Sequence, residues 1–157
     1  MNNSQYIQKI TISDLPEILK LEQKCFFGDS AYTINQLKYL ITQANSNCLL
    51  RRTDDEIQGY IIVLYRNGTS VAGIETINVD PSCRGKGIGR QLLFTAEDDM
   101  VFKGIKKIRL EVTTGNTAAI SLYQKSGFRI ISLLKNYYQY EHNGSHDAFR
   151  MIKQLTT

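Results

Sequence analysis

The sequence predicts a single mixed α/β domain over residues 1–157, in which about four helices flank a central, mostly antiparallel sheet. Three observations predict this class. The length suits one domain of ordinary size. The composition, 42% apolar and 22% charged, is that of a soluble globular protein. The apolar period switches repeatedly between 3.6 and 2, in the order β-α-α-β-β-β-α-β-α-β-β.

The N-terminal part reads as one short strand and two helices. The pattern predicts a strand over 7–12, a helix from 13 to about 25, a turn over 26–32 and a helix over 34–44. Ser13-Asp14 and Thr33 supply side-chain oxygens that suit the caps of the two helices. A meander follows, with strands over 48–52, 57–65 and 71–79. Asn67-Gly68 marks a hairpin turn between the last two.

The C-terminal part alternates strands and helices. The pattern predicts a loop over 80–89, a helix over 90–102, a strand over 107–112, a helix from Asn116 to Gly127 and a strand over 128–133. Residues 137–141 continue or resume that last strand in this interpretation. Asn143-Gly144 then forms a second hairpin turn, and a closing strand covers 148–155.

Composition excludes several classes of function. No apolar run approaches the ~20 residues of a membrane span, and the N-terminus lacks an apolar signal core, so we expect a cytoplasmic protein without a membrane partner. Cys25, Cys48 and Cys83 are too widely spaced for a metal site or a disulfide framework. The net charge of +4 arises after residue 70 without a long basic stripe, so we expect no nucleic-acid partner.

One glycine-rich loop carries the strongest chemical signal. Arg84-Gly85-Lys86-Gly87-Ile88-Gly89 follows a strand and opens a helix, and Arg90 adds a further cation. Glycines permit close backbone approach, and a helix N-terminus offers unpaired N–H groups to phosphate. The loop therefore predicts a phosphate-bearing ligand, and a diphosphate fits best. The alternative is a tight turn without a ligand. The spacing matches neither a dinucleotide fingerprint nor a Walker loop.

Two blocks resemble the GCN5-related N-acetyltransferase superfamily. Residues 77–89, Ile-Asn-Val-Asp-Pro-Ser-Cys-Arg-Gly-Lys-Gly-Ile-Gly, look like its acetyl-CoA-binding motif. Leu110-Glu111-Val112, residues 116–123 and Gly127-Phe128 match its second block in order and spacing. The resemblance implies a splayed sheet with acetyl-CoA between two central strands. It implies the following cofactor-binding residues: Ile77, Asn78, Val79, Arg84, Gly85, Lys86, Gly87, Ile88, Gly89, Arg90, Asn116 and Tyr123.

The resemblance also implies direct acetyl transfer from the thioester to an amine. Tyr123 is then the candidate acid near the coenzyme sulfur, although a tyrosine at this helical spacing is also common in a core. Glu111 is the main candidate base, Glu75 is its rival, and a water chain is a third option. Alternation along the strand is expected to place Glu75, Ile77 and Val79 on one face.

The acceptor is the least determined part of the prediction. Asn136-Tyr137-Tyr138 and Asp147-Ala148-x-x-Met151 look like the hairpin of the protein N-terminal-amine branch, typified by the ribosomal-protein alanine acetyltransferases. We therefore expect Tyr137 and Tyr138, with Tyr32, at the acceptor. The 26–32 loop lacks the Pro-Trp pair usual in that branch. A polyamine, amino acid or amine toxin is the alternative acceptor, and a non-catalytic acyl-CoA-binding domain is a third reading. A monomer and a homodimer both fit.

Overall fold

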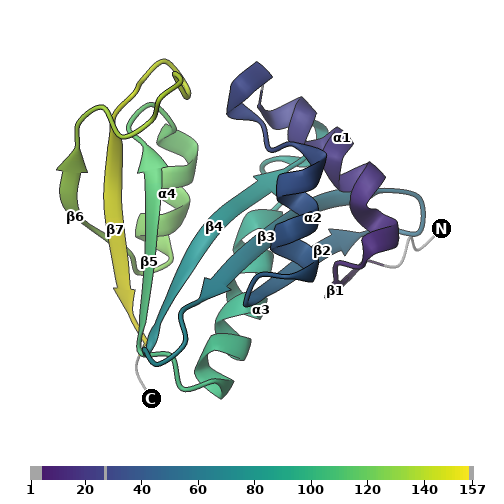
Figure 1. Ribbon diagram of the computed structural model, residues 1–157, viewed down its shortest axis with the longest axis horizontal. Coiled ribbons are helices and arrows are strands. Elements are labelled where there is room, and N and C mark those ends of the chain that lie inside the picture. The colour runs from purple at the N-terminus through teal and green to yellow at the C-terminus, as the bar shows by residue number, and fades with distance from the viewer. Residues whose placement is uncertain (1–4, 27, 156–157) are drawn as a thin grey trace.

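The computed structural model describes residues 5–26 and 28–155 (Figure 1). The ends of the expected 1–157 domain, and Phe27 of the expected 26–32 turn, lie outside these residues. The described helices and strands are β1 (Tyr6–Lys9), α1 (Leu15–Cys25), α2 (Ile34–Thr42), β2 (Ser46–Arg52), β3 (Ile57–Tyr65), β4 (Val71–Val79), α3 (Ile88–Phe102), β5 (Lys107–Thr113), α4 (Thr117–Lys125), β6 (Arg129–Leu134) and β7 (Ala148–Gln154).

The strands form one sheet that splits in the middle. Their order is β1-β2-β3-β4-β5-β7-β6, and every neighbouring pair is antiparallel except β4 and β5. Those two parallel strands are registered only from Val71 opposite Lys107 to Ile74 opposite Leu110. Beyond this point the strands diverge and the sheet opens into a V (Figure 1). The expected mixed and splayed sheet is therefore confirmed.

Helices cover the two faces of the sheet unequally. The helices α1 and α2 lie on one face of the β1–β4 half, and α3 and α4 lie behind the sheet (Figure 1). One apolar core packs α3 and α4 against β2 to β5 and β7. A separate core, which includes Ile18, Leu37 and Tyr60, packs α1 and α2 against β2 and β3. No helix among the described residues lies over the front of β5, β7 and β6 (Figure 1).

A β-bulge in β4 reverses which side chains share a face. Ile62 lies opposite Thr76 and Val63 lies opposite Ile74, so Glu75 is an extra residue in the strand. Ile77 and Val79 pack on the α3 side. Glu75 instead contacts Tyr32 on the α2 side. The expectation that Glu75, Ile77 and Val79 share one face is wrong, because simple alternation does not survive a bulge.

The segment expected to resume β6 is also different. Residues 137–141 form no strand in the described structure. Asn143-Gly144 does form a two-residue turn, in which His142 and Ser145 exchange backbone hydrogen bonds of 2.8 and 3.0 Å. Both turn residues have positive φ, 51° and 80°, as such turns require. The turn therefore lies at the tip of a long β6–β7 loop rather than between paired strands. Expected and observed boundaries elsewhere differ by a few residues, as at α3, which begins at Ile88.

Gly59 allows α3 to approach the sheet closely. A Cβ at this position would lie 2.8 Å from the Asn78 carbonyl oxygen and 3.3 Å from side-chain atoms of Ile88 and Leu92. By contrast, a Cβ on Gly73 in the next strand would meet only the Arg109 carbonyl oxygen, at 3.8 Å. The N-terminal turn of α3 is therefore positioned partly by the missing side chain at residue 59.

We predict that Gly59→Ala lowers the free energy of unfolding by roughly 1–3 kcal/mol, because the added methyl group overpacks this contact. Gly73→Ala is the matched control, with ordinary contact distances and an expected change within about 0.5 kcal/mol. Chemical denaturation of both variants measures the difference. Equal midpoints for the two variants would contradict the close approach.

Candidate active site

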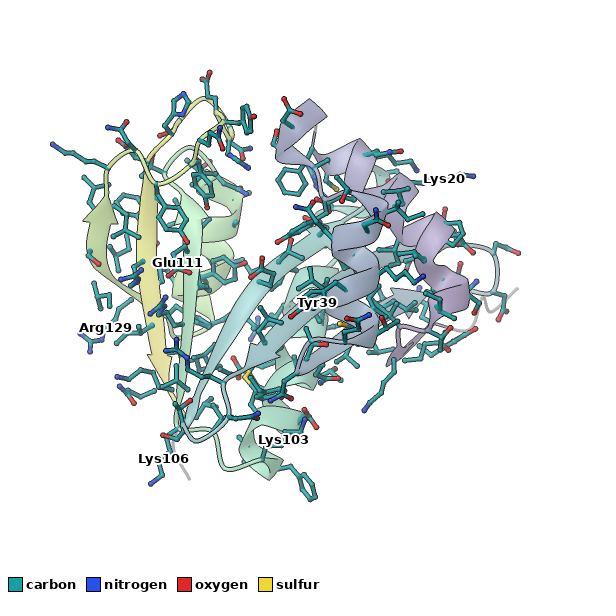
Figure 2. The ribbon with its side chains drawn as sticks, viewed as in Figure 1. Lys20, Tyr39, Lys103, Lys106, Glu111 and Arg129 are labelled. Atoms are coloured by element: carbon teal, nitrogen blue, oxygen red, sulfur yellow. The ribbon has the colours of Figure 1, made fainter. Side chains whose placement is uncertain are left out.

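A cavity of about 160 Å³ lies in the V between β4 and β5. We call it the central cavity. Its walls come from both halves of the sheet, from α1, α4 and the loop before α2, and from the β6–β7 loop. Figure 2 shows Glu111 on β5 on one side of the V and Tyr39 on α2 on the other. The predicted residues that line it are Tyr32, Glu75, Ile77, Glu111, Asn116, Tyr123 and Tyr138.

Tyr123 lies on the α4 side of the cavity. Its side chain is 7% exposed and packs edge-on against Phe128, with ring centroids 5.5 Å apart. Its hydroxyl has no hydrogen-bond partner among the described residues. Burial, together with the nearby Tyr138, raises the pKa of Tyr123 above its ordinary value. The phenol therefore keeps its proton at neutral pH and presents a donor to the cavity.

Glu111 is held by two guanidinium groups. Its carboxylate oxygen Oε1 accepts a hydrogen bond from Arg150 Nε at 3.0 Å and forms an ion pair with Arg109 Nε, also at 3.0 Å. Arg109 lies two residues earlier on the same face of β5, and Arg150 is the register partner of Glu111 on β7. The strand pairing therefore fixes the position of this carboxylate at the cavity wall.

Glu75 faces the same cavity from the opposite strand. The Tyr32 hydroxyl donates to its Oε1. Burial and the adjacent Glu75 charge raise the pKa of Tyr32 above its ordinary value, so this hydroxyl remains a donor. Glu75 and Glu111, the rival candidate bases, thus lie in one cavity but have different partners. Glu75 has a tyrosine, whereas Glu111 has two arginines.

A buried carboxylate that the sequence analysis did not select lies beside these groups. Glu22 on α1 is 1% exposed and lines the central cavity. It accepts from the Tyr60 hydroxyl, from Asn78 Nδ2 at 2.7 Å and from the Tyr32 backbone N–H at 3.3 Å. Burial raises the pKa of Glu22, and these hydrogen bonds oppose the rise. The sequence offered one signal, because Glu22 occupies a core-facing position in the apolar spacing of α1.

The expected role of Asn78 does not match where its side chain lies. The carboxamide donates to Glu22 and, at 2.8 Å, to the Tyr60 hydroxyl. It therefore points toward the α1 side of the sheet and does not line the central cavity. Ordinary alternation along β4 explains this placement, because Asn78 lies between Ile77 and Val79 and therefore on the opposite face.

The backbone of β4 directs polar groups away from β3 and toward the V. Asp80 N–H donates to the Gln58 carbonyl at 2.8 Å. In an antiparallel ladder, every second residue bonds the neighbouring strand, and the N–H and C=O of the residues between them point the other way. Because Asp80 bonds β3, Val79 and Ile77 are residues of the second kind, and their N–H and C=O point toward the V. The Val79 carbonyl also accepts from Arg84 Nε at 3.2 Å. Arg84, expected at a phosphate, is thus partly engaged with the strand end.

The glycine loop has the geometry of an anion-binding turn. Gly85 and Gly87 have φ of 80° and 79°, and a Cβ on either would meet open space. Gly87 is the N-cap of α3, and the first helical bond runs from Gln91 N–H to its carbonyl, at 3.0 Å. The amides of residues 88–90 therefore have no acceptor within the helix. Lys86 and Arg90 are exposed beside them, with Arg90 over the Phe94 ring at 5.1 Å. The loop fits a diphosphate sterically and electrostatically.

The β6–β7 loop closes the far end of the cavity. The tyrosine Tyr138 packs on His142, with ring centroids 4.2 Å apart, and burial raises the pKa of Tyr138 to about 12. His142 also contacts Phe26 at the end of α1, 6.2 Å between centroids, so the two walls of the V meet there. Tyr137 packs edge-on against Tyr138 but is 47% exposed and does not line the cavity. Phe26 and His142 carried no motif from which the sequence could have indicated them.

Asn116 links the cavity to α4. Its side-chain oxygen accepts from the Ala119 N–H at 3.1 Å, so it caps the helix as predicted, and the residue lines the cavity. The described residues contain no group of three His, Cys, Asp or Glu side chains that could hold a metal ion. No helix in residues 5–26 or 28–155 is long and apolar enough to cross a membrane.

Comparison with known proteins places this site in a family. The model of the acetyltransferase (GNAT) family matches residues 15–128, and the chain belongs to that family of N-acetyltransferases, which use acetyl-CoA. The N-alpha-acetyltransferase RimI of Mycobacterium tuberculosis is 31% identical over 135 residues, which cover 85% of this chain and 84% of that protein. The [ribosomal protein bS18]-alanine N-acetyltransferase of Salmonella typhimurium is 30% identical over 151 residues, covering 96% and 97%. An uncharacterised Mycobacterium leprae protein is 37% identical, but the chain spans only 38% of its length.

Solved structures share the fold. The ribosomal-protein-S18-alanine N-acetyltransferase from Escherichia coli superposes with a TM-score of 0.86 at 24% identity, covering 98% of this chain and 96% of that one. The PaiA N-acetyltransferase from Thermoplasma acidophilum, in complex with coenzyme A, gives a TM-score of 0.79 at 23% identity, covering 97% and 99%. The predicted fold class and family are therefore confirmed.

An ion pair ties the strand end before the glycine loop to α1 and gives a pH-dependent prediction. Lys24 Nζ donates to Asp80 at 2.9 Å, and this bond lowers the pKa of Asp80 to about 2. A lowered pKa in the folded state stabilises the protein above the unfolded pKa, and that contribution is lost as pH falls through the folded value. We predict that Lys24→Met is less stable than the parent at neutral pH, and that the difference closes between about pH 4 and pH 2.

Lys20→Met on the same helix is the matched control, because Lys20 is exposed (Figure 2). Urea denaturation across this pH range measures both variants. A Lys24→Met deficit that is constant from pH 7 to pH 2 would contradict the role of the ion pair.

Proposed function

We propose that this chain binds acetyl-CoA in the V between β4 and β5 and acetylates the α-amine of a protein N-terminus. The observation that carries the proposal is the convergence of Glu75, Glu111, Tyr123 and Tyr138 on one cavity. The similarity to N-terminal-amine acetyltransferases over more than 80% of the chain supports this class of acceptor. The single domain over 1–157 and a cytoplasmic location belong to the same proposal, and the three free thiols suit a reducing compartment.

The chain has groups suited to each part of the cofactor. Bound acetyl-CoA supplies an acetyl group already activated as a thioester. The amides of residues 85–90 and the α3 N-terminus would hold the diphosphate. The outward N–H and C=O groups of Ile77 and Val79 would pair with the amides of the pantetheine arm, as an added strand does. The Val79 amide is also a donor suited to a developing oxyanion.

Tyr123 and the glutamates divide the proton transfers in this proposal. Tyr123 is buried and protonated, so it would donate to the departing thiolate sulfur. The attacking amine must lose a proton, and Glu111 would accept it directly or through water. Its two arginine partners keep the carboxylate fixed. Glu75, which already accepts from Tyr32, is the rival for the same task.

A small amine is the second candidate acceptor. The 26–32 loop has no Trp, and Phe26 touches His142 across the V, which narrows the route for an extended peptide. The streptothricin acetyltransferase of Streptomyces lavendulae is 38% identical over 86 residues, covering 55% of this chain and 46% of that protein. A screen with acetyl-CoA against short peptides, polyamines and amino acids separates the two candidates. Acetylation of small amines alone would overturn the peptide proposal.

We predict that saturating acetyl-CoA raises the thermal midpoint, since a ligand at a hundredfold excess over Kd adds about 2.7 kcal/mol to the native state. Gly87→Glu should abolish the shift, because its side chain would fill diphosphate space and repel the ligand. Gly68→Glu is the matched control, a positive-φ glycine in a remote turn. A full shift in folded Gly87→Glu, or a shift with ATP but not acetyl-CoA, would overturn the cofactor assignment.

We predict that Tyr123→Phe lowers kcat by ~10²–10⁴, the range for a positioned general acid, with little change in acetyl-CoA binding. Glu111→Gln should lower the rate most where the acceptor amine is protonated, and its deficit should shrink as pH approaches the pKa of the amine. Glu75→Gln should do so only with a polyamine acceptor.

The pH–rate profiles of these three variants, each with one peptide and one polyamine, provide the measurement. Near-parental kcat for Tyr123→Phe at every pH would remove that hydroxyl from the mechanism. A small, pH-independent deficit in both glutamate variants would assign the proton to a water chain.

A further inference from the structure

We propose that Glu22 is a positioning residue for the acceptor: it anchors Tyr32, and Tyr32 orients Glu75 at the wall of the central cavity. The inference rests on the proposed function, because the wall it describes is the acceptor side of that site. Glu22 lies outside every motif that the sequence analysis used.

The contacts of Glu22 join separate segments of the chain. From α1, its Oε2 accepts from the Tyr60 hydroxyl on β3 and from Asn78 Nδ2 on β4. Its Oε1 accepts from the backbone N–H of Tyr32, in the loop that leads into α2. One oxygen therefore binds the sheet, and the other binds the loop. The carboxylate holds the loop against β3 and β4.

This carboxylate is buried without a cation. No Lys, Arg or His in the described part of the chain forms an ion pair with Glu22, and its hydrogen-bond donors are a phenol, an amide side chain and a backbone amide. Glu97 on α3 is the contrasting case: it is also buried, but it pairs with Lys153 at 2.9 Å. A buried carboxylate without a cation is costly, and an apolar residue would fill the same core position of α1. This cost indicates that Glu22 is present to bind these three donors, and not to fill a core position of α1.

Tyr32 transmits this anchoring to the acceptor side. Its backbone is bound by Glu22, and its hydroxyl donates to Glu75 at the bulge. Tyr32 and Glu75 line both the central cavity and a mostly apolar surface groove along α2, whose other residues are Asn35, Gln36, Tyr39 and Leu40. The Tyr32–Glu75 pair is therefore the partition between the two spaces. Displacing Tyr32 would release Glu75 and join the groove to the cavity, while the glycine loop stays in place.

The test compares Glu22→Met with Glu22→Gln and the control Glu97→Met. Glu22→Met removes all three hydrogen bonds that the carboxylate accepts. We expect a roughly tenfold higher KM for the amine acceptor, with acetyl-CoA affinity unchanged. Hydrogen exchange at the Tyr32 amide should become faster. Glu22→Gln keeps a carbonyl oxygen for the Tyr32 amide, so it should restore both the slow exchange and an acceptor KM within about threefold of the parent. Glu97→Met should lose stability without changing either readout.

Other outcomes overturn the assignment. Unchanged exchange at Tyr32 in Glu22→Met, or equal losses of acceptor and acetyl-CoA affinity, would reduce Glu22 to a general structural role. If Glu22→Met does not fold, Tyr60→Phe removes one donor to Glu22 and should move exchange and acceptor KM in the same direction by less. No change in either measurement would overturn the proposal. If the parent acetylates no peptide, the proposed acceptor fails, and exchange at Tyr32 alone still decides the role of Glu22.

Discussion

The early end of hydrogen bonding between β4 and β5 is the constraint on which the site depends. Both strands continue past Ile74 and Leu110, where their pairing stops. Each strand then carries backbone groups without a partner strand, and such groups must be satisfied by water or a ligand. The V is therefore a polar slot between two apolar packing layers. A strand-like ligand with amides of its own is the complement that this slot best accepts.

The bulge at Glu75 works together with this divergence. It lies directly after Ile74, the last residue of β4 that pairs with β5, and it bends the strand at that point. It also changes the face on which the following side chains lie. Ile77 and Val79 join the core under α3, while Glu75 faces the central cavity with Glu111 opposite. One inserted residue thus places the apolar side chains of β4 in the core and its carboxylate at the cavity.

Much of this fold could be predicted from the sequence, because apolar periodicity and turn residues define each helix and most strands. The glycine loop was predictable because few residues other than glycine tolerate the left-handed conformation that Gly85 and Gly87 adopt before α3. The bulge was missed because simple alternation was assumed from Glu75 to Val79, although the apolar positions change phase between Ile74 and Ile77. Glu75 was therefore assigned to the wrong face. Of the two arginines at Glu111, Arg109 is local to β5, but Arg150 depends on the β5–β7 register, which is a long-range property. Residues 137–141 are rich in β-forming tyrosines, yet their partners are loop groups such as the His146 carbonyl.

The two separate apolar cores have a consequence for how such a protein can diversify. The core under α3 and α4 supports the strands of the slot and the helix that follows the glycine loop. The core under α1 and α2 supports the wall that carries Tyr32. Substitutions in the second core can reshape the Tyr32 wall of the central cavity while the first keeps its packing, because mutations without shared neighbours act nearly independently. Selection for a new amine can therefore proceed on one side of the sheet at little cost to the other, and library design for altered acceptors belongs in α1, α2 and their connecting loop.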